Sequence, residues 1–172
     1  PVPAPEPEPV PAPACWQVAD EPDAGYEDTN CDGIDGDAEA AVFVDAMNEF
    51  YRRGGIPVGV VRDGKTPEPS PMLSVPLAMK NADGSPVYPR RLASDREAPE
   101  AVALLTRVLA AQPDQSVVVI QVGFSTNLAR LLETAEGREL ARRKVKLLSL
   151  MGGAFPKNQP EYNIKIDIPA AK

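Results

Sequence analysis

Residues 117–132 read VVVIQVGFSTNLARLL and residues 144–155 read KVKLLSLMGGAF, and these two stretches decide the fold. Each contains an apolar run of strand length that passes into a polar loop with glycine. A helical stretch separates the two runs, so the alternation predicts neighbouring parallel strands joined by a right-handed crossover. Ligands of open α/β sheets bind beyond the carboxyl ends of such strands, which makes the two loops the first candidates for a site.

Helical and strand-like patterns alternate along the rest of the chain. Apolar spacing predicts a helix from Ala40 to Tyr51, ended by the Gly54–Gly55 pair, and then a short buried strand at Ile56–Val61. Residues 62–97 contain six prolines and predict a long irregular excursion with a hairpin near Asp83–Gly84. The elements expected after it are an amphipathic helix at Pro99–Gln112, a buried strand at Val117–Val122, a helix capped by Ser125 or Thr126 and ending at Leu132, a short helix around Glu136–Arg143 and a buried strand at Val145–Leu150.

This order predicts an α/β fold with an open, mainly parallel sheet and flanking helices, in only part of the chain. Residues 1–14, PVPAPEPEPVPAPA, carry proline at every odd position from 1 to 13. That pattern favours an extended polyproline helix and is typical of a linker, with a peptide ligand for an aromatic groove as the alternative. Residues 15–40 then form an acidic segment, and residues 41–172 form the α/β domain.

Charge is distributed unevenly along the chain. The net charge is −7, and residues 1–50 carry thirteen acidic side chains and no lysine or arginine. This excludes nucleic-acid binding by the front of the chain and suits a cation site. Residues 51–172 carry eighteen basic and twelve acidic side chains, spread as on a solvated surface rather than gathered into a phosphate-binding patch. No stretch is long and apolar enough to span a bilayer.

Two residue types limit the chemistry. Histidine is absent, which excludes a histidine base and an imidazole zinc site within this chain. The two cysteines, Cys15 and Cys31, are too few for a cysteine-rich metal site, and they either form one disulfide in an oxidising compartment or stay as free thiols. Together with the proline-rich linker, this predicts a secreted, periplasmic or cell-surface protein that its linker tethers.

The segment from Asp28 to Glu39, DTNCDGIDGDAE, matches the loop of an EF-hand or dockerin-like calcium site. Calcium takes about six to eight oxygen ligands, so side chains at alternate positions must converge on the ion. Asp28, Asn30 and Asp32 supply such oxygens, Gly33 allows the sharp turn, and Glu39 closes the shell with both carboxylate oxygens. No helix is expected ahead of the loop, so the pattern is half of the usual motif, and a solvated acidic run is the alternative.

Residues 123–167 carry the spaced motifs of a known enzyme family. The first, G-x-x-T-N-L-A, is present as Gly123, Thr126, Asn127, Leu128 and Ala129. The second, M-G-G followed by E-Y-N and an aspartate, is present as Met151, Gly152, Gly153, Glu161, Tyr162, Asn163 and Asp167. On these residues the chain resembles the nucleoside hydrolases, in particular the inosine/uridine-preferring ones, from about Phe43 to Lys172. The resemblance implies a calcium-dependent enzyme that splits ribonucleosides into base and ribose.

The resemblance also implies roles for individual residues. Thr126 would offer its backbone carbonyl to calcium, and Asn127 would brace the loop. Calcium would orient a water and the ribose diol, while an aspartate takes the proton of that water. Asp167 is expected to cap the next helix. The residues that would hydrogen-bond the ribose hydroxyls are Asn158, Glu161 and Asn163.

The acidic segment can also be compared with the aspartate motif that follows the first strand of this family. The residues that match it are Asp28, Thr29, Asp37, Ala38 and Ala40. Asp28 and Asp37 are therefore the candidates for the catalytic base, while Asn30 stands where the family has the aspartate that activates the water. The expected calcium ligands from both comparisons are Asp28, Asn30, Asp32, Asp37, Glu39 and Thr126.

Two hypotheses of different classes follow from these motifs. The first is a nucleoside hydrolase-like protein whose substrate is a ribonucleoside. Because the likeness covers about half of the family's fold, an uncovered sheet edge would favour a homo-oligomer. The second is a secreted calcium-binding or interaction module without catalytic activity, in which the hydrolase-like part is a scaffold. A nucleoside together with calcium should stabilise the enzyme, whereas the module should respond to calcium alone.

Overall fold

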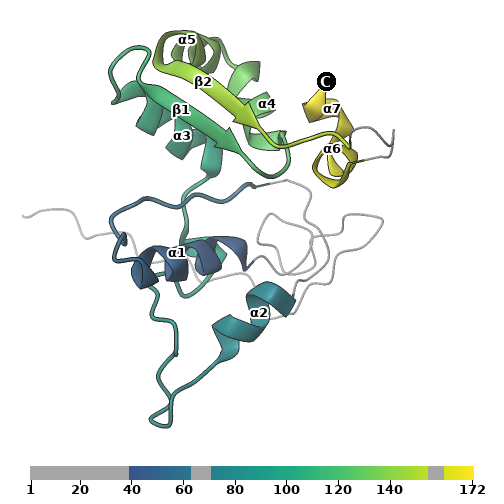
Figure 1. The fold of residues 1–172 in the computed structure, drawn as a ribbon. Coiled ribbons are helices and arrows are strands. Elements are labelled where there is room, and N and C mark those ends of the chain that lie inside the picture. Colours follow the sequence, from purple (N-terminus) through teal and green to yellow (C-terminus); the bar gives the residue numbers. More distant parts are fainter. Residues whose placement is uncertain (1–38, 63–70, 155–160) are drawn as a thin grey trace, which may run out of the picture.

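The computed structural model describes residues 39–62, 71–154 and 161–172 (Figure 1). The predictions made for residues 1–38 and 155–160, which include the linker, the calcium loop, both cysteines and Asn158, lie outside the described residues. The elements are α1 (Ala40–Phe50), α2 (Pro71–Ala78), the 3-10 turn η2 (Asp95–Glu97), α3 (Ala101–Ala110), β1 (Val117–Gln121), α4 (Thr126–Glu133), α5 (Ala135–Lys144), β2 (Val145–Leu150), α6 (Tyr162–Ile166) and α7 (Ile168–Ala171). Figure 1 shows α1 and α2 in one part of the molecule and the sheet with α3 to α7 in the other.

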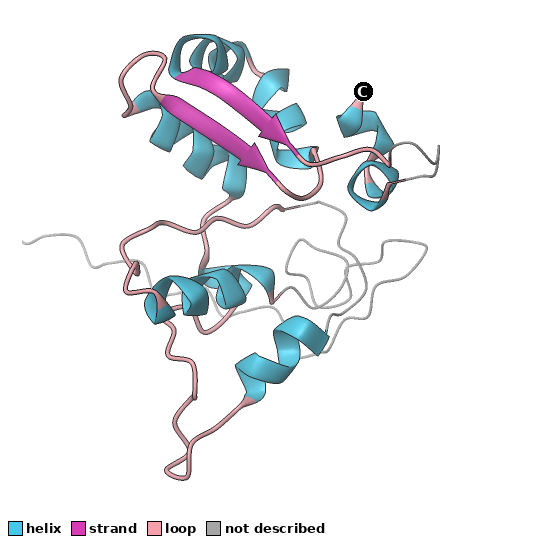
Figure 2. Ribbon diagram, in the orientation of Figure 1, coloured by secondary structure: helices cyan, strands magenta, loops and turns pink. Residues whose placement is uncertain are grey.

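The strands β1 and β2 lie side by side as a two-stranded parallel sheet (Figure 2). Val117 pairs with Val145, and the register runs on from there with one irregularity next to Val117. Leu109, Leu131 and Leu140, from α3, α4 and α5, form a buried cluster against both valines. Among the described residues, the parallel pair with flanking helices confirms the α/β arrangement in the form of a small sheet.

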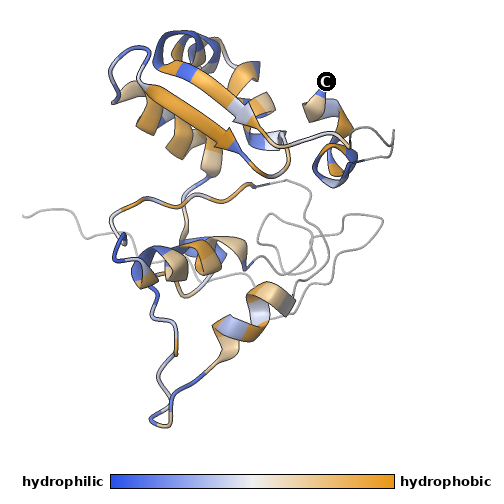
Figure 3. Ribbon diagram, in the orientation of Figure 1, coloured by the Kyte–Doolittle hydropathy of each residue, from blue (hydrophilic) through white to orange (hydrophobic). Residues whose placement is uncertain are grey.

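Burial of both faces of these strands, as the apolar runs predicted, is wrong for the described chain. Successive side chains of a strand point to opposite faces. Val118 is 50% exposed and Ile120 is 70% exposed, and they alternate with partly covered residues. Figure 3 shows β1 and β2 as apolar ribbons drawn in front of α3 and α4. The prediction fails because the described helices pack on one face of the sheet and leave the other face bare.

The strand expected at Ile56–Val61 is also wrong. Val60 forms one isolated parallel bridge next to the start of α3, with backbone bonds of 2.9 and 2.8 Å on either side of the bridge. The ladder cannot continue because its partner segment enters the helix at Ala101. Gly59 lies so close to α3 that a Cβ built there would be 3.0 Å from the Cα of Ala101. This segment therefore fastens its own part of the molecule to α3 instead of widening the sheet.

The excursion between the two parts holds more regular structure than its prolines predicted. Residues 71–78 form α2 with Pro76 inside the helix, and residues 95–97 form η2. The hairpin expected near Asp83–Gly84 is confirmed as a tight turn, closed by a bond of 2.8 Å from Asn81 N to Ser85 O. Gly84 has φ 84°, a left-handed conformation that glycine adopts without strain.

A buried aspartate from η2 caps the first turn of α1. Asp95 is 2% exposed, and its two carboxylate oxygens accept bonds from Ala41 N at 3.1 Å and Val42 N at 2.9 Å. Burial raises the pKa of Asp95 above its ordinary value, while these amides and the nearby Arg62 act in the opposite direction. A guanidinium N–H of Arg62 points to the carbonyls of Asp95 and Ala98 at 3.1 and 3.2 Å, so this residue ties the same turn to the chain before α3.

A second buried aspartate, in the middle of α1, holds the loop that leads to η2. Asp45 is fully buried and accepts bonds from Arg91 N at 2.6 Å and Leu92 N at 2.9 Å. The Arg91 guanidinium also pairs with it at 2.7 Å. Burial alone would raise the pKa of Asp45, but the amide of Leu92 and the amide and guanidinium of Arg91 outweigh burial and hold it below its ordinary value.

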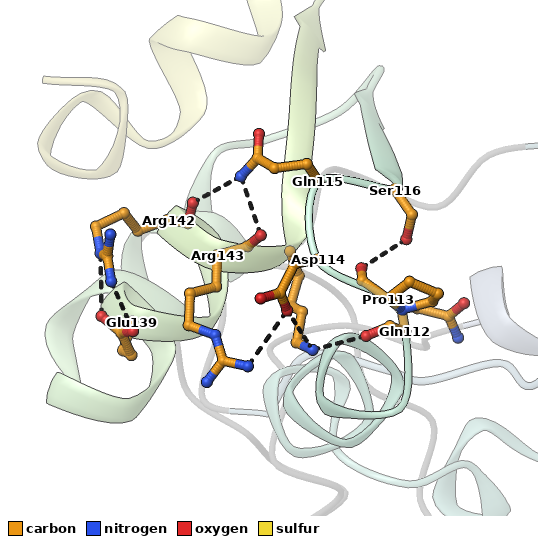
Figure 4. A network of polar contacts seen from close by, with 9 residues as sticks. Gln112, Pro113, Asp114, Gln115, Ser116, Glu139, Arg142 and Arg143 are labelled. Carbon is orange, nitrogen blue, oxygen red and sulfur yellow. Dashed lines mark hydrogen bonds and ion pairs between the residues drawn. The ribbon is translucent and has the colours of Figure 1, made fainter.

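The loop from α3 to β1 grips the end of α5 (Figure 4). The side-chain amide of Gln115 donates to the carbonyls of Arg142 and Arg143, both at 3.0 Å. The carboxylate of Asp114 pairs with Arg143 at 3.2 Å and with Lys144 at 2.8 Å. These bonds satisfy the free carbonyls at the end of a helix and lower the pKa of Asp114 through its hydrogen bonds to Lys144 and Arg143.

The helices expected in this part are present with small shifts at their ends. Glu100 caps α3 by accepting a bond of 2.7 Å from Ala103 N, so the helix begins after the predicted Pro99. The short helix expected at Glu136–Arg143 is α5, and the strand expected at Val145–Leu150 is β2 with the same bounds. Over the described ranges, we find no helix with the length and apolar character that crossing a bilayer requires.

Candidate functional site

The loops that follow β1 and β2 leave the sheet at the same edge (Figure 1). The loop after β1 leads into α4 and the loop after β2 leads toward α6. A bond of 2.9 Å from Met151 N to Gln121 O joins the two loops where the strands end. This is the position at which α/β sheets bind ligands, so the structure brings both loop motifs to the expected edge.

The two glycines after β2 have local structural reasons. Gly153 has φ 85°, in the left-handed region where other residues are strained. A Cβ on Gly152 would meet the side chain of Leu150 at 2.9 Å and that of Ile164 at 3.4 Å. The pair therefore lets the chain turn sharply and lets α6 approach the end of β2 closely.

A hydrogen bond across the edge links the start of α4 to the C-terminal helices. The hydroxyl of Thr126 donates to Asp167 Oδ2 at 2.5 Å, although the two residues lie 41 positions apart. The other carboxylate oxygen, Oδ1, accepts from Ala170 N at 3.2 Å. The prediction that Asp167 caps the next helix is thus confirmed, and the same carboxylate also holds the loop after β1.

Side-chain capping of α4 by Ser125 or Thr126 is wrong. Ser125 occupies the cap position but makes no capping bond, since its hydroxyl accepts a bond of 2.9 Å from Gln121 Nε2. The Thr126 hydroxyl is bonded to Asp167. Both hydroxyls therefore fix the loop between the strand and the helix, and both residues are 9% exposed.

A hollow of 380 Å³ lies beside the loop after β1. Gln121, Gly123, Thr126 and Asn127 contribute to its lining, together with apolar residues of β1 and α3. Gln121 Oε1 and Asn127 Oδ1 are buried and have no hydrogen-bond partner in the described part of the chain. Buried acceptors without partners are costly, by about 1–3 kcal/mol each, so two of them beside a hollow mark a place for a donor group or a cation.

Glu161 and Asn163 lie on the side of the second loop. The Glu161 carboxylate caps α6 by accepting from Asn163 N and Ile164 N, both at 3.1 Å. The Asn163 side-chain amide is 3.5 Å from the carbonyl of Met151, at the end of β2. The Phe124 and Tyr162 rings, with centroids 6.0 Å apart, connect this side to the loop after β1. Both predicted ribose-binding residues thus lie near the shared edge.

Calcium can be tested only against the described part of its expected ligand set. Thr126 lies at the edge described above, whereas Glu39 is the residue before α1, in the other part of the molecule. Within the described ranges, no three acidic, histidine or cysteine side chains gather into a metal-binding group. The two unpartnered amide oxygens suit a hard cation such as Ca²⁺, but they are a fraction of its shell.

Sequence reasoning missed two polar residues of this edge, Gln121 and Ser125. Gln121 interrupts an otherwise apolar run, VVVIQV, at the last residue of β1. A polar residue at the carboxyl end of a buried strand is a pattern that could have marked it. Comparisons of the chain with protein-family models, with curated proteins and with solved structures find no match.

Proposed function

We propose that this chain is a nucleoside hydrolase-like protein that hydrolyses the N-glycosidic bond of ribonucleosides, with the help of calcium, to give the free base and ribose. The observation that carries the proposal is the meeting of the two resembling motifs at one edge of a parallel sheet. The Thr126–Asp167 bond of 2.5 Å joins them there, beside a hollow with two unpartnered amide oxygens.

The residues of this edge provide what a sugar needs. Ribose hydroxyls are donors, and Gln121 Oε1 and Asn127 Oδ1 are buried acceptors without donors. The Glu161 carboxylate accepts two amide bonds but, with about four lone-pair sites, can accept a hydroxyl as well. Asn163 would offer its amide alongside, and Asn158, outside the described residues, would complete the ribose-binding set.

The water must be activated from elsewhere in the chain. We propose Asp28 or Asp37 as the base that takes its proton, and both lie outside the described residues. Bound calcium would supply a positive charge that orients the water and the ribose diol. The Thr126–Asp167 bond would keep the loop after β1 in place while the sugar binds, which makes this pair a positioning device. We further propose export and tethering by the linker, based on the composition of residues 1–38.

The test is ribose release from inosine and from uridine by the full chain, with calcium and with a chelator. We expect release that depends on calcium. Absence of release from folded protein would contradict the proposal. In that case, calcium binding that Asp32→Ala abolishes and that a nucleoside does not strengthen would assign the chain to the calcium-binding module instead.

A matched pair of variants tests the site itself. Glu161→Gln keeps an acceptor for the α6 cap but removes the charge, and we expect at least about a tenfold loss in kcat/KM, equivalent to about 1.4 kcal/mol. Glu136→Gln makes the same change on the exposed surface of α5 and should leave the rate unchanged. Equal rates for the two variants would remove Glu161 from the proposed site.

A further inference from the structure

An aromatic groove lies between α1 and α2, far along the chain from the candidate site. Its volume is 190 Å³, and its walls include Met47, Phe50, Tyr51, Pro76, Leu77 and Tyr88. Phe50 and Tyr51 meet edge to face with centroids 5.1 Å apart, and the Tyr88 ring lies 6.3 Å from Phe50. Phe50 is 62% exposed and Tyr51 is 64% exposed, so the rings present apolar faces to the surroundings.

The neighbourhood of this groove is basic. Arg52 and Arg53 follow Tyr51 directly at the end of α1, and both side chains are exposed. Neither takes part in an ion pair within the ranges that the structure describes. The nearest acidic residue along the chain, Glu49, is already paired with Arg91 at 3.0 Å. The groove therefore combines stacked aromatic rings with two guanidinium groups that lack a partner.

The first fourteen residues of the same chain have the complementary chemistry. A polyproline helix has about three residues per turn, so every third residue falls on one edge. Pro1, Ala4, Pro7, Val10 and Pro13 then share an edge that is apolar throughout. The only charges of the segment, Glu6 and Glu8, fall one on each of the other two edges. An apolar edge flanked by carboxylates is what a groove of aromatic rings flanked by arginines would bind.

We infer that the proline-rich segment 1–14 docks in the aromatic groove of its own chain. The apolar edge packs on Phe50, Tyr51 and Tyr88, and Glu6 and Glu8 pair with Arg52 and Arg53. Residues 14–38 join the segment to the start of α1 and reach up to about 80 Å when extended, while α1 is only about 16 Å long. The connection is therefore long enough, and tethering supplies a high effective concentration that a weak contact requires.

The experiment uses a fluorescently labelled peptide with the sequence of residues 1–14, titrated into the full chain and followed by anisotropy. In wild-type protein the attached segment competes with the peptide. The full-length variant Pro5→Ser, Pro7→Ser, Pro9→Ser has a segment that cannot form the apolar edge, which frees the groove. We expect the peptide to bind this variant at least about tenfold more tightly than wild type. Equal affinities, or no binding to either protein, would overturn the inference.

Second changes in the triple-proline variant identify the groove. Phe50→Ala should abolish peptide binding, whereas Tyr162→Ala, which removes an exposed ring far along the chain, should leave it intact. If Phe50→Ala does not fold, a peptide with Glu6→Lys and Glu8→Lys replaces it, and the expected result is weaker binding and a weaker salt dependence. Retention of binding in either case overturns the docking site. Wild-type dimers that the triple-proline change dissolves would overturn docking within one chain in favour of exchange between two chains.

Discussion

Residues 101–151 and residues 39–100 are held together in different ways. In the first region, consecutive elements pack on one another through large apolar side chains, and the bonds of the sheet connect strands separated by two helices. In the second region, the apolar clusters are small, built around Ala41, Val60 and Ala98 and around Val42, Ala46 and Leu77. Two buried carboxylates, Asp45 and Asp95, make bonds across 46 to 54 residues there. The contrast teaches that one region rests on pattern and the other on particular polar bonds.

The largest expected effect is in the apolar region. Leu109→Ala removes a side chain that is 1% exposed at the centre of the cluster between α3, α4 and α5. We expect a loss of about 3 kcal/mol in the free energy of unfolding, measured by urea titration. Val108→Ala in the same helix, at a position 36% exposed, should cost much less. Hydrogen exchange that rises in residues 39–62 as strongly as in residues 101–151 would break the comparison, because the regions would then unfold as one.

The second effect tests the polar region. Asp45→Ala leaves the amides of Arg91 and Leu92 without their acceptor, and we expect a loss of about 2 kcal/mol. Glu49→Ala removes the other carboxylate partner of Arg91, which is more exposed, and should cost less. Urea titration of both variants measures the difference. Equal losses would mean that the Arg91 ion pair matters more than the buried amide bonds.

The third effect is a pH dependence with opposite signs for the two carboxylates. The pKa of Asp95 is raised above the ordinary 3.8, so its contribution to stability is full below that value and is lost as pH rises through the folded pKa. The pKa of Asp45 is lowered, so its contribution is present above the ordinary value and is lost as pH falls.

Unfolding free energies between about pH 3 and pH 7 separate these two contributions. The stability deficit of Asp95→Asn relative to wild type should shrink as pH rises, and that of Asp45→Asn should grow. Deficits that change in the same direction would contradict the assigned environments.

The smallest effect is expected on the bare face of the sheet. Ile120→Thr should change the free energy of unfolding by no more than about 0.5 kcal/mol, because the side chain is 70% exposed. Val119→Thr, one residue away on the face toward the helices, should cost more, since it puts a hydroxyl among apolar side chains. An Ile120→Thr loss comparable to that of Leu109→Ala would show that something covers this face in solution.

The sequence was sufficient to predict the elements of the apolar region. Apolar spacing located α1, α3 and α5 within a few residues and β2 at both of its ends, because local pattern determines where such elements form. The same reasoning could not predict that Ile120 is exposed, since an apolar run has the same pattern whether helices cover one face or two. It also missed that Val60 would find a partner that turns into a helix after one bridge.

The candidate site was predictable in place and only partly in contacts. Strand-then-loop order located the edge beyond β1 and β2, and Asp167 caps a helix as expected. The bonds of Ser125 to Gln121 and of Thr126 to Asp167 were not predictable, because a short hydroxyl can cap its own helix or reach across the fold. The distant acceptor bonds of Asp45 and Asp95 were missed for the same reason.

The cap that Asp95 provides for α1 also sets an order of events during synthesis. The first turn of α1 leaves the ribosome 54 residues before the carboxylate that accepts its Ala41 amide. A helix of 11 residues is marginal on its own, so α1 remains incompletely formed until that carboxylate emerges. At about 5–20 residues per second, this wait lasts several seconds. A translational pause anywhere between these two points would lengthen the time for which the nascent helix is uncapped.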